Sequence, residues 1–199
     1  MEKLKKKYHH GNLRKELIEK GIEMINEVGE EKLSLRKLAK ICGVSNAAPY
    51  TYFNKKSDLL EAMRTYIWEL LAIELEKARK KYENSDKLLV KLGKTYVLFF
   101  CKNSQYYNFI ILRNNKKTDL LLELSKNENT DQRAFNILKS EATKILQKAN
   151  FSAEAIQDKV IAMWALVQGL STIMIMYDIN YSENWEKKIE KIIESICII

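Results

Sequence analysis

Apolar residues recur at helical spacing along almost the whole chain. Between residues 12 and 28 the stripe consists of Leu13, Leu17, Gly21, Met24 or Ile25, and Val28. This spacing places them on one face of a helix, which Gly29 is positioned to end. Similar spacing predicts helices over residues 57–82, 86–102, 105–112, 131–149, 153–178 and 183–198. With six glycines and one proline in 199 residues, the chain is predicted to be all-α.

Residues 34–60 have the layout of a helix-turn-helix DNA reader. The apolar face of a first short helix consists of Leu35, Leu38 and Cys42. Ser34 is placed to cap that helix, and Gly43 permits the left-handed turn that should follow. Ser45 can then cap a second helix. The segment therefore predicts two helices joined by a tight turn.

The second helix should present an uncharged face with little aliphatic bulk. Asn46 can pair with adenine, Ala and Thr side chains can contact a thymine methyl group, and a Tyr hydroxyl can reach a phosphate. Lys55 and Lys56 follow beside the start of the next helix, where phosphate is favoured. The predicted DNA-binding residues are Ser34, Arg36, Ser45, Asn46, Ala47, Ala48, Tyr50, Thr51, Tyr52, Lys55 and Lys56.

Charge is concentrated at the same end of the chain. Residues 1–56 contain 13 Lys and Arg against 7 Asp and Glu, so they carry +6 of the formal net charge of +8. A basic excess of this kind is the electrostatic footprint of a nucleic-acid-binding surface. The basic arm at residues 1–10 is interpreted either as a solvated tail or as a segment laid along DNA phosphates or into a minor groove.

Residues 8 to about 65 resemble the DNA-binding domain of the TetR family of bacterial transcriptional regulators. The resemblance rests on YHHGNLR at 8–14, SLRKLAKICGVS at 34–45 and AAPYTYFNKKSDLL at 47–60. Tyr52 stands where the family usually has His, and a phenol can still donate to a phosphate. The resemblance implies a three-helix DNA-binding domain at residues 1–56 and a C-terminal helical bundle at 57–199 for ligand binding and dimerisation.

The resemblance also implies a homodimer formed through the last two helices, residues 153–178 and 183–198. A single recognition helix reads only a few base pairs, so a two-fold dimer on a palindromic operator in double-stranded DNA fits a regulator better. The family implies repression that an apolar or amphipathic small-molecule effector relieves. Trp164, Ala165 and Gln168-Gly169 resemble the Trp-His-Gly pattern of one TetR subgroup, with Gln in place of His.

Aromatic and polarizable residues gather in the second half of the chain, where an effector would bind. Each can equally be a core residue, because helical proteins pack with such side chains. Gln168 differs from the others, since an amide in an apolar helix needs hydrogen-bond partners. The candidate pocket residues are Tyr96, Phe100, Tyr107, Met163, Trp164 and Gln168.

Other functions find less support in the sequence. No phosphate-binding glycine loop, metal-ligand cluster or nucleophile with a His partner indicates an enzyme, a metal site or a cofactor. Three widely spaced cysteines indicate no disulfide framework, and the N-terminus lacks the apolar region of a signal peptide, so the cytoplasm is expected. Residues 160–177 carry no charge, but Gln168, Ser171 and Thr172 interrupt them and argue against a membrane span.

The sequence thus predicts a dimeric TetR-type repressor that a small molecule releases from its operator. A nucleoid-associated or architectural DNA-binding protein without an effector is the alternative. A helical protein-interaction module that has lost DNA binding is a third possibility, which the intact face at residues 45–56 disfavours.

Overall fold

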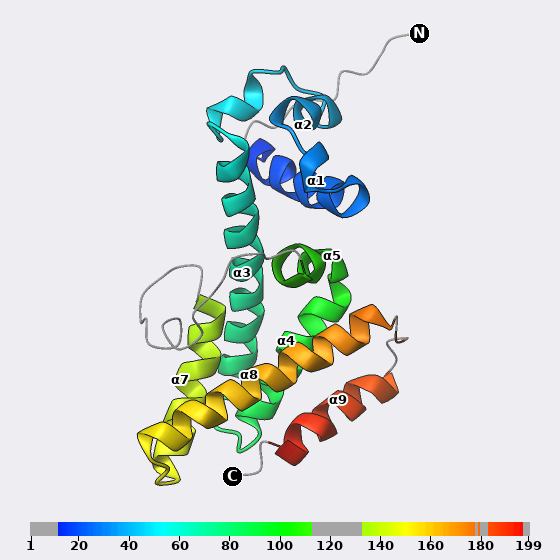
Figure 1. Ribbon diagram of the computed structural model, residues 1–199. Helices are drawn as coiled ribbons and strands as arrows, with labels where there is room; N and C mark the ends of the chain where they lie inside the picture. Colours follow the sequence, from blue (N-terminus) through cyan, green and yellow to red (C-terminus); the bar gives the residue numbers. More distant parts are fainter. Residues whose placement is uncertain (1–11, 113–132, 178, 180–182, 197–199) are drawn as a thin grey trace.

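The computed structural model describes residues 12–112, 133–177, 179 and 183–196 (Figure 1). The basic arm at residues 1–10, the segment at 113–130 and the histidines at 9 and 10 lie outside the described residues. All regular elements of the described residues are helical, which confirms the predicted all-α fold. Residues 13–51 form a head at one end of a long helix at residues 56–81, and the helices at residues 88–107, 133–176 and 183–196 form a body around its other end.

The head is built on α1 (Leu13–Val28), which leads through the short η1 (Glu30–Lys32) into α2 (Leu35–Ile41). The predicted inward stripe of α1 is confirmed up to Ile25, which is fully buried. Its last member, Val28, was wrongly placed, because the residue lies in the final turn and is 42% exposed. Gly29 ends the helix with φ at 90°, a left-handed conformation that favours glycine.

Helix α3 (Lys56–Lys81) connects the head to the body. It buries one residue per turn along most of its length. This stripe consists of Leu59, Met63, Ile67, Leu71 and Leu75, each with none of its surface exposed. Helix α3 contacts α1 in the head and two helices of the body, α4 (Leu88–Lys102) and α7 (Arg133–Lys148), so a single helix contributes to both ends of the molecule.

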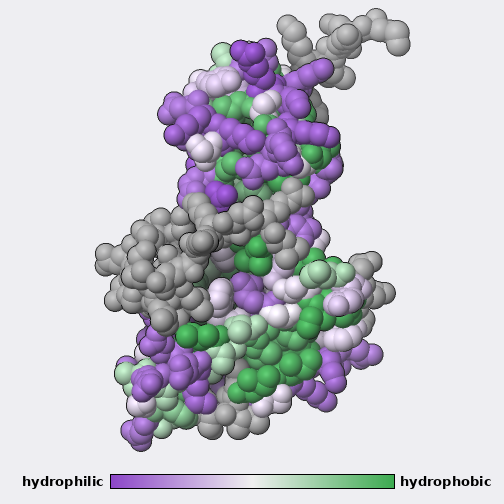
Figure 2. Space-filling model, in the orientation of Figure 1, coloured by the Kyte–Doolittle hydropathy of each residue, from purple (hydrophilic) through white to green (hydrophobic). Residues whose placement is uncertain are grey.

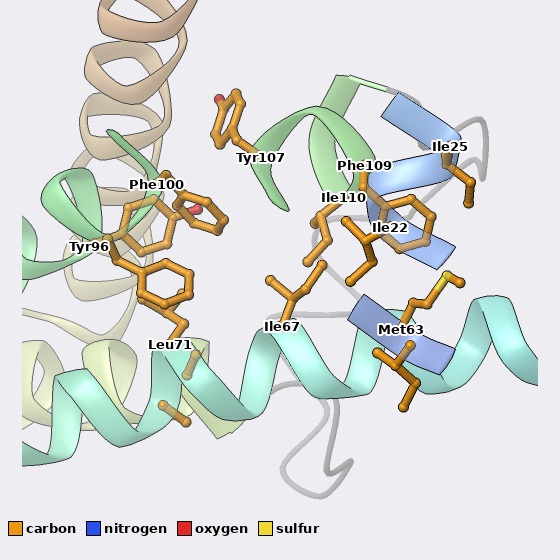
Figure 3. Close-up of a cluster of buried hydrophobic side chains, with 14 of the residues drawn as sticks. Ile22, Ile25, Met63, Ile67, Leu71, Tyr96, Phe100, Tyr107, Phe109 and Ile110 are labelled. Carbon is orange, nitrogen blue, oxygen red and sulfur yellow. The ribbon is translucent and has the colours of Figure 1, made fainter. Parts of the chain in front are cut away.

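The short helix α5 (Ser104–Tyr107) and the π-helical turn η3 (Asn108–Leu112) lie between the head and the body. Phe109 and Ile110 of η3 are each 4% exposed. Figure 3 shows them beside Ile22 of α1 and Met63 of α3. One continuous apolar core therefore runs from the head into the body.

The body places α4 (Leu88–Lys102) against α8 (Ala153–Met176), with α7 (Arg133–Lys148) and α9 (Glu183–Ile196) alongside. Ile189 and Ile193 of α9 are buried at 0% and 1% exposure. Ion pairs connect α9 with α4 and with Lys87, the residue before α4. They join Lys87 to Glu194 at 2.8 Å, Lys94 to Glu190 at 2.9 Å and to Glu186 at 3.5 Å, and Lys91 to Glu190. Hydrogen bonds from Lys91 and Lys94 lower the pKa of Glu190, so it stays charged at neutral pH.

Phe109→Ala is expected to lower the free energy of unfolding by about 3–5 kcal/mol, because a buried ring is lost and a cavity remains. Ile73→Ala is the matched control, since Ile73 lies on α3 and is 44% exposed. The control should stay within about 0.5 kcal/mol of the parent protein. Denaturant unfolding followed by circular dichroism measures both values. Equal losses for the two variants would contradict the central packing role of Phe109.

Candidate nucleic-acid interface

The interface begins with α2 and the turn after it. The Oγ of Ser34 accepts a hydrogen bond from the backbone N–H of Lys37 at 3.2 Å, which confirms the predicted N-cap. Gly43 has φ at 67°, as predicted for a left-handed turn. The N–H of Val44 bonds to the carbonyl of Ala39 at 2.9 Å and that of Gly43 bonds to the carbonyl of Lys40 at 3.2 Å. This pair of bonds is a Schellman motif, and it turns the chain sharply away from α2.

Residues 45–52 follow this turn and form what we term the reading segment. The predicted second helix is shorter than expected: it is the single 3₁₀ turn η2 (Ala48–Thr51). The Ser45 carbonyl, rather than a capping side chain, accepts the N–H of Ala48 at 3.0 Å. Pro49 is buried at the start of η2, where its missing N–H costs little. The buried proline anchors the segment to the head, while residues 45–47 and 50–52 on either side of it are exposed to solvent.

Most of the predicted DNA-binding residues lie at the surface of the head. The exposed ones are Arg36, Ser45, Asn46, Ala47, Tyr50, Thr51, Tyr52 and Lys55. Ala48 is half-buried, and Ser34 acts as a helix cap. Tyr50 and Tyr52 are 46% and 40% exposed. Large aromatic rings stabilise a protein most when they are buried, so two exposed rings in one segment indicate a binding surface. The sequence-predicted set is thus brought together on one end of the molecule (Figure 1).

The two lysines at the start of α3 differ in their surroundings. The Lys55 side chain is exposed. The Lys56 ammonium instead donates a hydrogen bond to the carbonyl of Glu30 in η1, at 2.5 Å and in a partly buried position. The structure therefore leaves Lys55 available for phosphate, whereas Lys56 joins α3 to the start of the helix-turn-helix.

Two further residues shape the interface and were missed by the sequence analysis. The guanidinium of Arg14 lies 5.7 Å from the centre of the Phe53 ring, directly after the reading segment. The Asp58 carboxylate accepts the backbone N–H groups of Asn54 at 3.2 Å and Lys55 at 3.3 Å. Asp58 thereby fixes the path of the chain as it enters α3. The contact of Arg14 with Phe53 cannot be read from spacing, because it joins residues that the fold brings together. The Asp58 contact is local, and its signal is a carboxylate three residues after the helix N-cap.

Polar contacts also join the head to the body. The Tyr66 hydroxyl of α3 donates to the Glu19 carboxylate of α1 at 2.5 Å. Burial and this hydrogen bond to a carboxylate raise the pKa of Tyr66, so it stays protonated. The Asn26 amide of α1 donates to the carbonyl of Gln105 in α5 at 3.0 Å. Helix α1 is therefore hydrogen-bonded to both α3 and α5.

The candidate pocket residues separate into two groups in the body. Tyr96, Phe100 and Tyr107 form an aromatic cluster, with ring centres 5.0 Å and 5.1 Å apart along the series. The Tyr107 hydroxyl is 2.5 Å from Thr172 Oγ1, and it donates to the backbone carbonyl of Gln168 at 3.1 Å. The Tyr96 hydroxyl is buried and has no hydrogen-bond partner among the described residues, and burial raises its pKa well above the usual range. This cluster ties α5 to α8.

Met163 and Trp164 belong to a different place in the body, a small cavity of about 40 Å³ between α4, α7, α8 and α9. Its other apolar walls include Leu89, Phe135 and Val160. The volume is enough for a few water-sized groups, and the apolar walls favour a dry interior. The four other candidates, Tyr96, Phe100, Tyr107 and Gln168, do not line this cavity.

Comparisons with known proteins find relatives of the N-terminal part of the chain and of the fold as a whole. Residues 17–63 match the model of the bacterial regulatory proteins of the tetR family. The HTH-type transcriptional regulator BetI of Ectopseudomonas mendocina is 34% identical over 67 residues, which cover 34% of each chain. The nucleoid occlusion factor SlmA of Haemophilus ducreyi is 27% identical over 179 residues, covering 88% of this chain and 86% of SlmA. The TetR family transcriptional regulator PfmR of Thermus thermophilus has a TM-score of 0.63 at 18% identity, with 90% of this chain and 96% of PfmR covered.

Residues 17–63 are therefore similar to the bacterial regulatory proteins of the tetR family. The match to BetI spans about a third of the length of BetI. The likeness to PfmR shows the shared fold. Assignment to the Trp-His-Gly subgroup stays a prediction. Within the described residues, no cluster of three or more His, Cys, Asp or Glu side chains could hold a metal ion.

Lys55→Ala is expected to reduce the salt dependence of DNA binding by about one unit of slope in log K against log salt, because one phosphate contact is lost. Lys56→Ala is the matched control. It should leave the slope unchanged and lower the free energy of unfolding by about 1–2 kcal/mol, because its hydrogen bond to Glu30 is internal. Fluorescence anisotropy of a labelled duplex across a salt series, together with thermal unfolding, separates the two effects. A reduced slope in Lys56→Ala and an unchanged slope in Lys55→Ala would contradict this prediction and show that Lys56 is the phosphate contact.

Proposed function

We propose that the chain is a dimeric repressor of the TetR type that a small-molecule effector releases from its operator. The observation that carries the proposal is the exposed reading segment, which is uncharged at its centre and held in place by the buried Pro49. Such a surface can approach base edges in a major groove. Exposed cations at either side, Arg36 and Lys55, suit the flanking phosphates. We further infer a cytoplasmic location, as expected for bacterial regulators of this type.

Dimerisation is supported by the outer face of α8. Figure 2 shows a broad hydrophobic area on the body where α8 lies in Figure 1. Ile173 is 48% exposed and Met176 is 64% exposed, and Ile196 of the neighbouring α9 is 53% exposed. Such a patch on a soluble protein marks an interaction surface. By length and apolar composition α8 could also span a membrane, but one such helix is weak evidence, and a subunit interface has the same composition.

Gly169 adds a specific argument for close approach of a second subunit. It lies on the same exposed face of α8 as Ala165 and Ile173, and a Cβ added at Gly169 would meet nothing within 4 Å. A glycine inside a helix costs about 1 kcal/mol relative to alanine. No contact within the described part of the protomer requires a glycine at this position. A helix of a partner subunit packed closely against this face would require one. A two-fold interface would place the same face of both subunits together.

Gly169→Arg is expected to convert the dimer to a monomer, because the new side chain meets open space in the protomer but blocks a partner helix. At protein concentrations low enough for the parent protein to be monomeric, the two proteins should unfold at nearly the same temperature. Gln157→Arg, at an exposed position elsewhere on α8, serves as the control and should remain dimeric. Sedimentation equilibrium measures both masses. A dimeric Gly169→Arg protein would place the interface on another surface.

Effector binding is proposed for the body cavity that Met163 and Trp164 line. Its small volume means that a ligand of ordinary size must enlarge it, so the ligand would favour a more open arrangement of α7 and α8. That change can reach the head along two connections. One is α3, which spans both parts, and the other is α5, where Tyr107 bonds to α8 and Gln105 to Asn26 of α1. The ligand shifts DNA binding only by its difference in affinity for the two arrangements.

Ala142→Val is expected to abolish the response to apolar effectors, because the added methyl groups fill part of the cavity that Ala142 lines. The assay is the loss of DNA binding on addition of a panel of aliphatic and aromatic alcohols and carboxylates. Ala153→Val, at the exposed start of α8, should respond as the parent protein does. An undiminished response in Ala142→Val would move the effector site elsewhere in the body.

A second candidate function, a nucleoid-associated protein without an effector, is favoured by one observation. The similarity to the nucleoid occlusion factor SlmA extends over most of both chains. Such a protein would bind many genomic sites, and no small molecule would alter its affinity. The described cavity and the contacts between α5 and α8 do not separate the two candidates, since either body could contain them.

The test of the proposed function is selection of duplexes from a random-sequence DNA pool at about 0.15 M salt, where non-specific phosphate binding is weakened. A palindrome with half-sites one helical turn apart, about 34–36 Å, is the result expected for a dimeric regulator. Retention without a consensus sequence would favour the nucleoid-associated function, and absence of retention would contradict both.

A further inference from the structure

We propose that the reading segment selects A·T base pairs, so that the core of each half-site is A·T-rich. The inference rests on the proposed function, because it assumes that residues 45–52 enter the major groove. It adds the class of sequence that this particular segment recognises. The preference follows from the hydrogen-bonding groups that the segment exposes and from the neighbouring groups that are already engaged inside the head.

The reading segment lacks the side chains that read G·C pairs most strongly. Guanine is most often recognised by Arg or Lys through O6 and N7, and cytosine by the carboxylate of Asp or Glu through N4. Residues 45–52 contain none of these four amino acids. Asn46 is exposed, and its side chain has no hydrogen-bond partner among the described residues. A carboxamide is the group that pairs in two places with N6 and N7 of adenine.

Thr51 strengthens the argument because its hydroxyl is already engaged. The Thr51 Oγ1 donates to the carbonyl of Ala48 at 2.7 Å. The hydroxyl proton is therefore not available for O6 or N7 of guanine. The methyl group of Thr51 remains as a contact for the C5 methyl group of thymine, and the exposed Ala47 offers a second methyl group of the same kind.

Three charged residues near the segment already have partners inside the head. The Lys37 ammonium donates to the carbonyl of Lys32 at 3.1 Å, and that of Lys56 donates to the carbonyl of Glu30. The Asp58 carboxylate accepts backbone N–H groups at the start of α3. Arg36 is exposed on α2, outside the segment, so a guanine that it read would flank the A·T core.

The first test uses base analogues in the highest-affinity duplex from the random pool. Inosine·cytosine presents the major groove of G·C and the minor groove of A·T, because inosine lacks the N2 amino group. Replacing one core A·T pair with either G·C or inosine·cytosine should weaken binding by a similar factor, roughly tenfold. Replacing core thymines with deoxyuridine should also weaken binding, because the C5 methyl group is lost.

Variants assign these effects to residues. Asn46→Ala should remove the preference for adenine at one position, whereas Asn84→Ala, at the exposed turn after α3, should not. Thr51→Ser retains the hydroxyl that bonds to Ala48 and loses the methyl group, so it should no longer distinguish thymine from uracil at the position that Thr51 contacts. Thr51→Val retains methyl groups and should still distinguish them.

The outcomes separate this inference from the proposed function. An enriched palindrome with G·C pairs in its core would overturn the inference and leave the dimeric regulator standing. Binding that G·C weakens and inosine·cytosine does not weaken would also overturn it, because the minor groove would then be the source of the preference. An A·T-rich site without two-fold symmetry, read through Asn46 and Thr51, would support the inference and contradict the dimeric regulator. Binding without any base preference would contradict both.

Discussion

The packing of Phe109 and Ile110 between the head and the body is the constraint on which the rest of the structure depends. Both side chains are almost fully buried, and they fill the space between α1 and α3 at the level where the head meets the body. If η3 moved by the width of a side chain, Ile22 of α1 would lose part of its packing. Closely packed interiors resist such partial changes, so the head and the body are expected to move together. The orientation of the reading segment is consequently linked to the arrangement of the body.

This linkage explains how a small apolar cavity can influence a surface at the far end of the molecule. Helix α8 forms one wall of the cavity and holds the Tyr107 hydroxyl through Thr172 and Gln168. Displacing α8 would pull on α5 and η3, and through them on α1. The same helix carries the exposed face that we assign to the subunit interface. A ligand, a partner subunit and the head therefore all depend on the position of one helix, which is the kind of shared element that couples separate sites.

The sequence predicted the parts of the structure that depend on local chemistry. The Ser34 cap, the Gly43 turn and the buried stripe of α3 each follow from residue type and spacing. The short 3₁₀ form of the reading segment was not predicted, because backbone hydrogen bonds between near neighbours compete closely with a regular helix. The internal bond of Lys56 and the separation of Tyr107 from the cavity lining were also not predicted. Both depend on which elements the fold brings together across many residues, and periodicity carries no information on that.

Hydrogen exchange of the free protein tests the linkage of head and body most directly. If one core joins them, the slowest amides of α1, such as those of Ile22 and Ile25, should exchange with the same opening free energy as the slowest amides of α4. Denaturant should change both in parallel. If the amides of α1 open with a free energy lower by several kcal/mol while those of α4 stay protected, the head unfolds by itself. In that case the position of α8 could not set the orientation of the reading segment through the shared core.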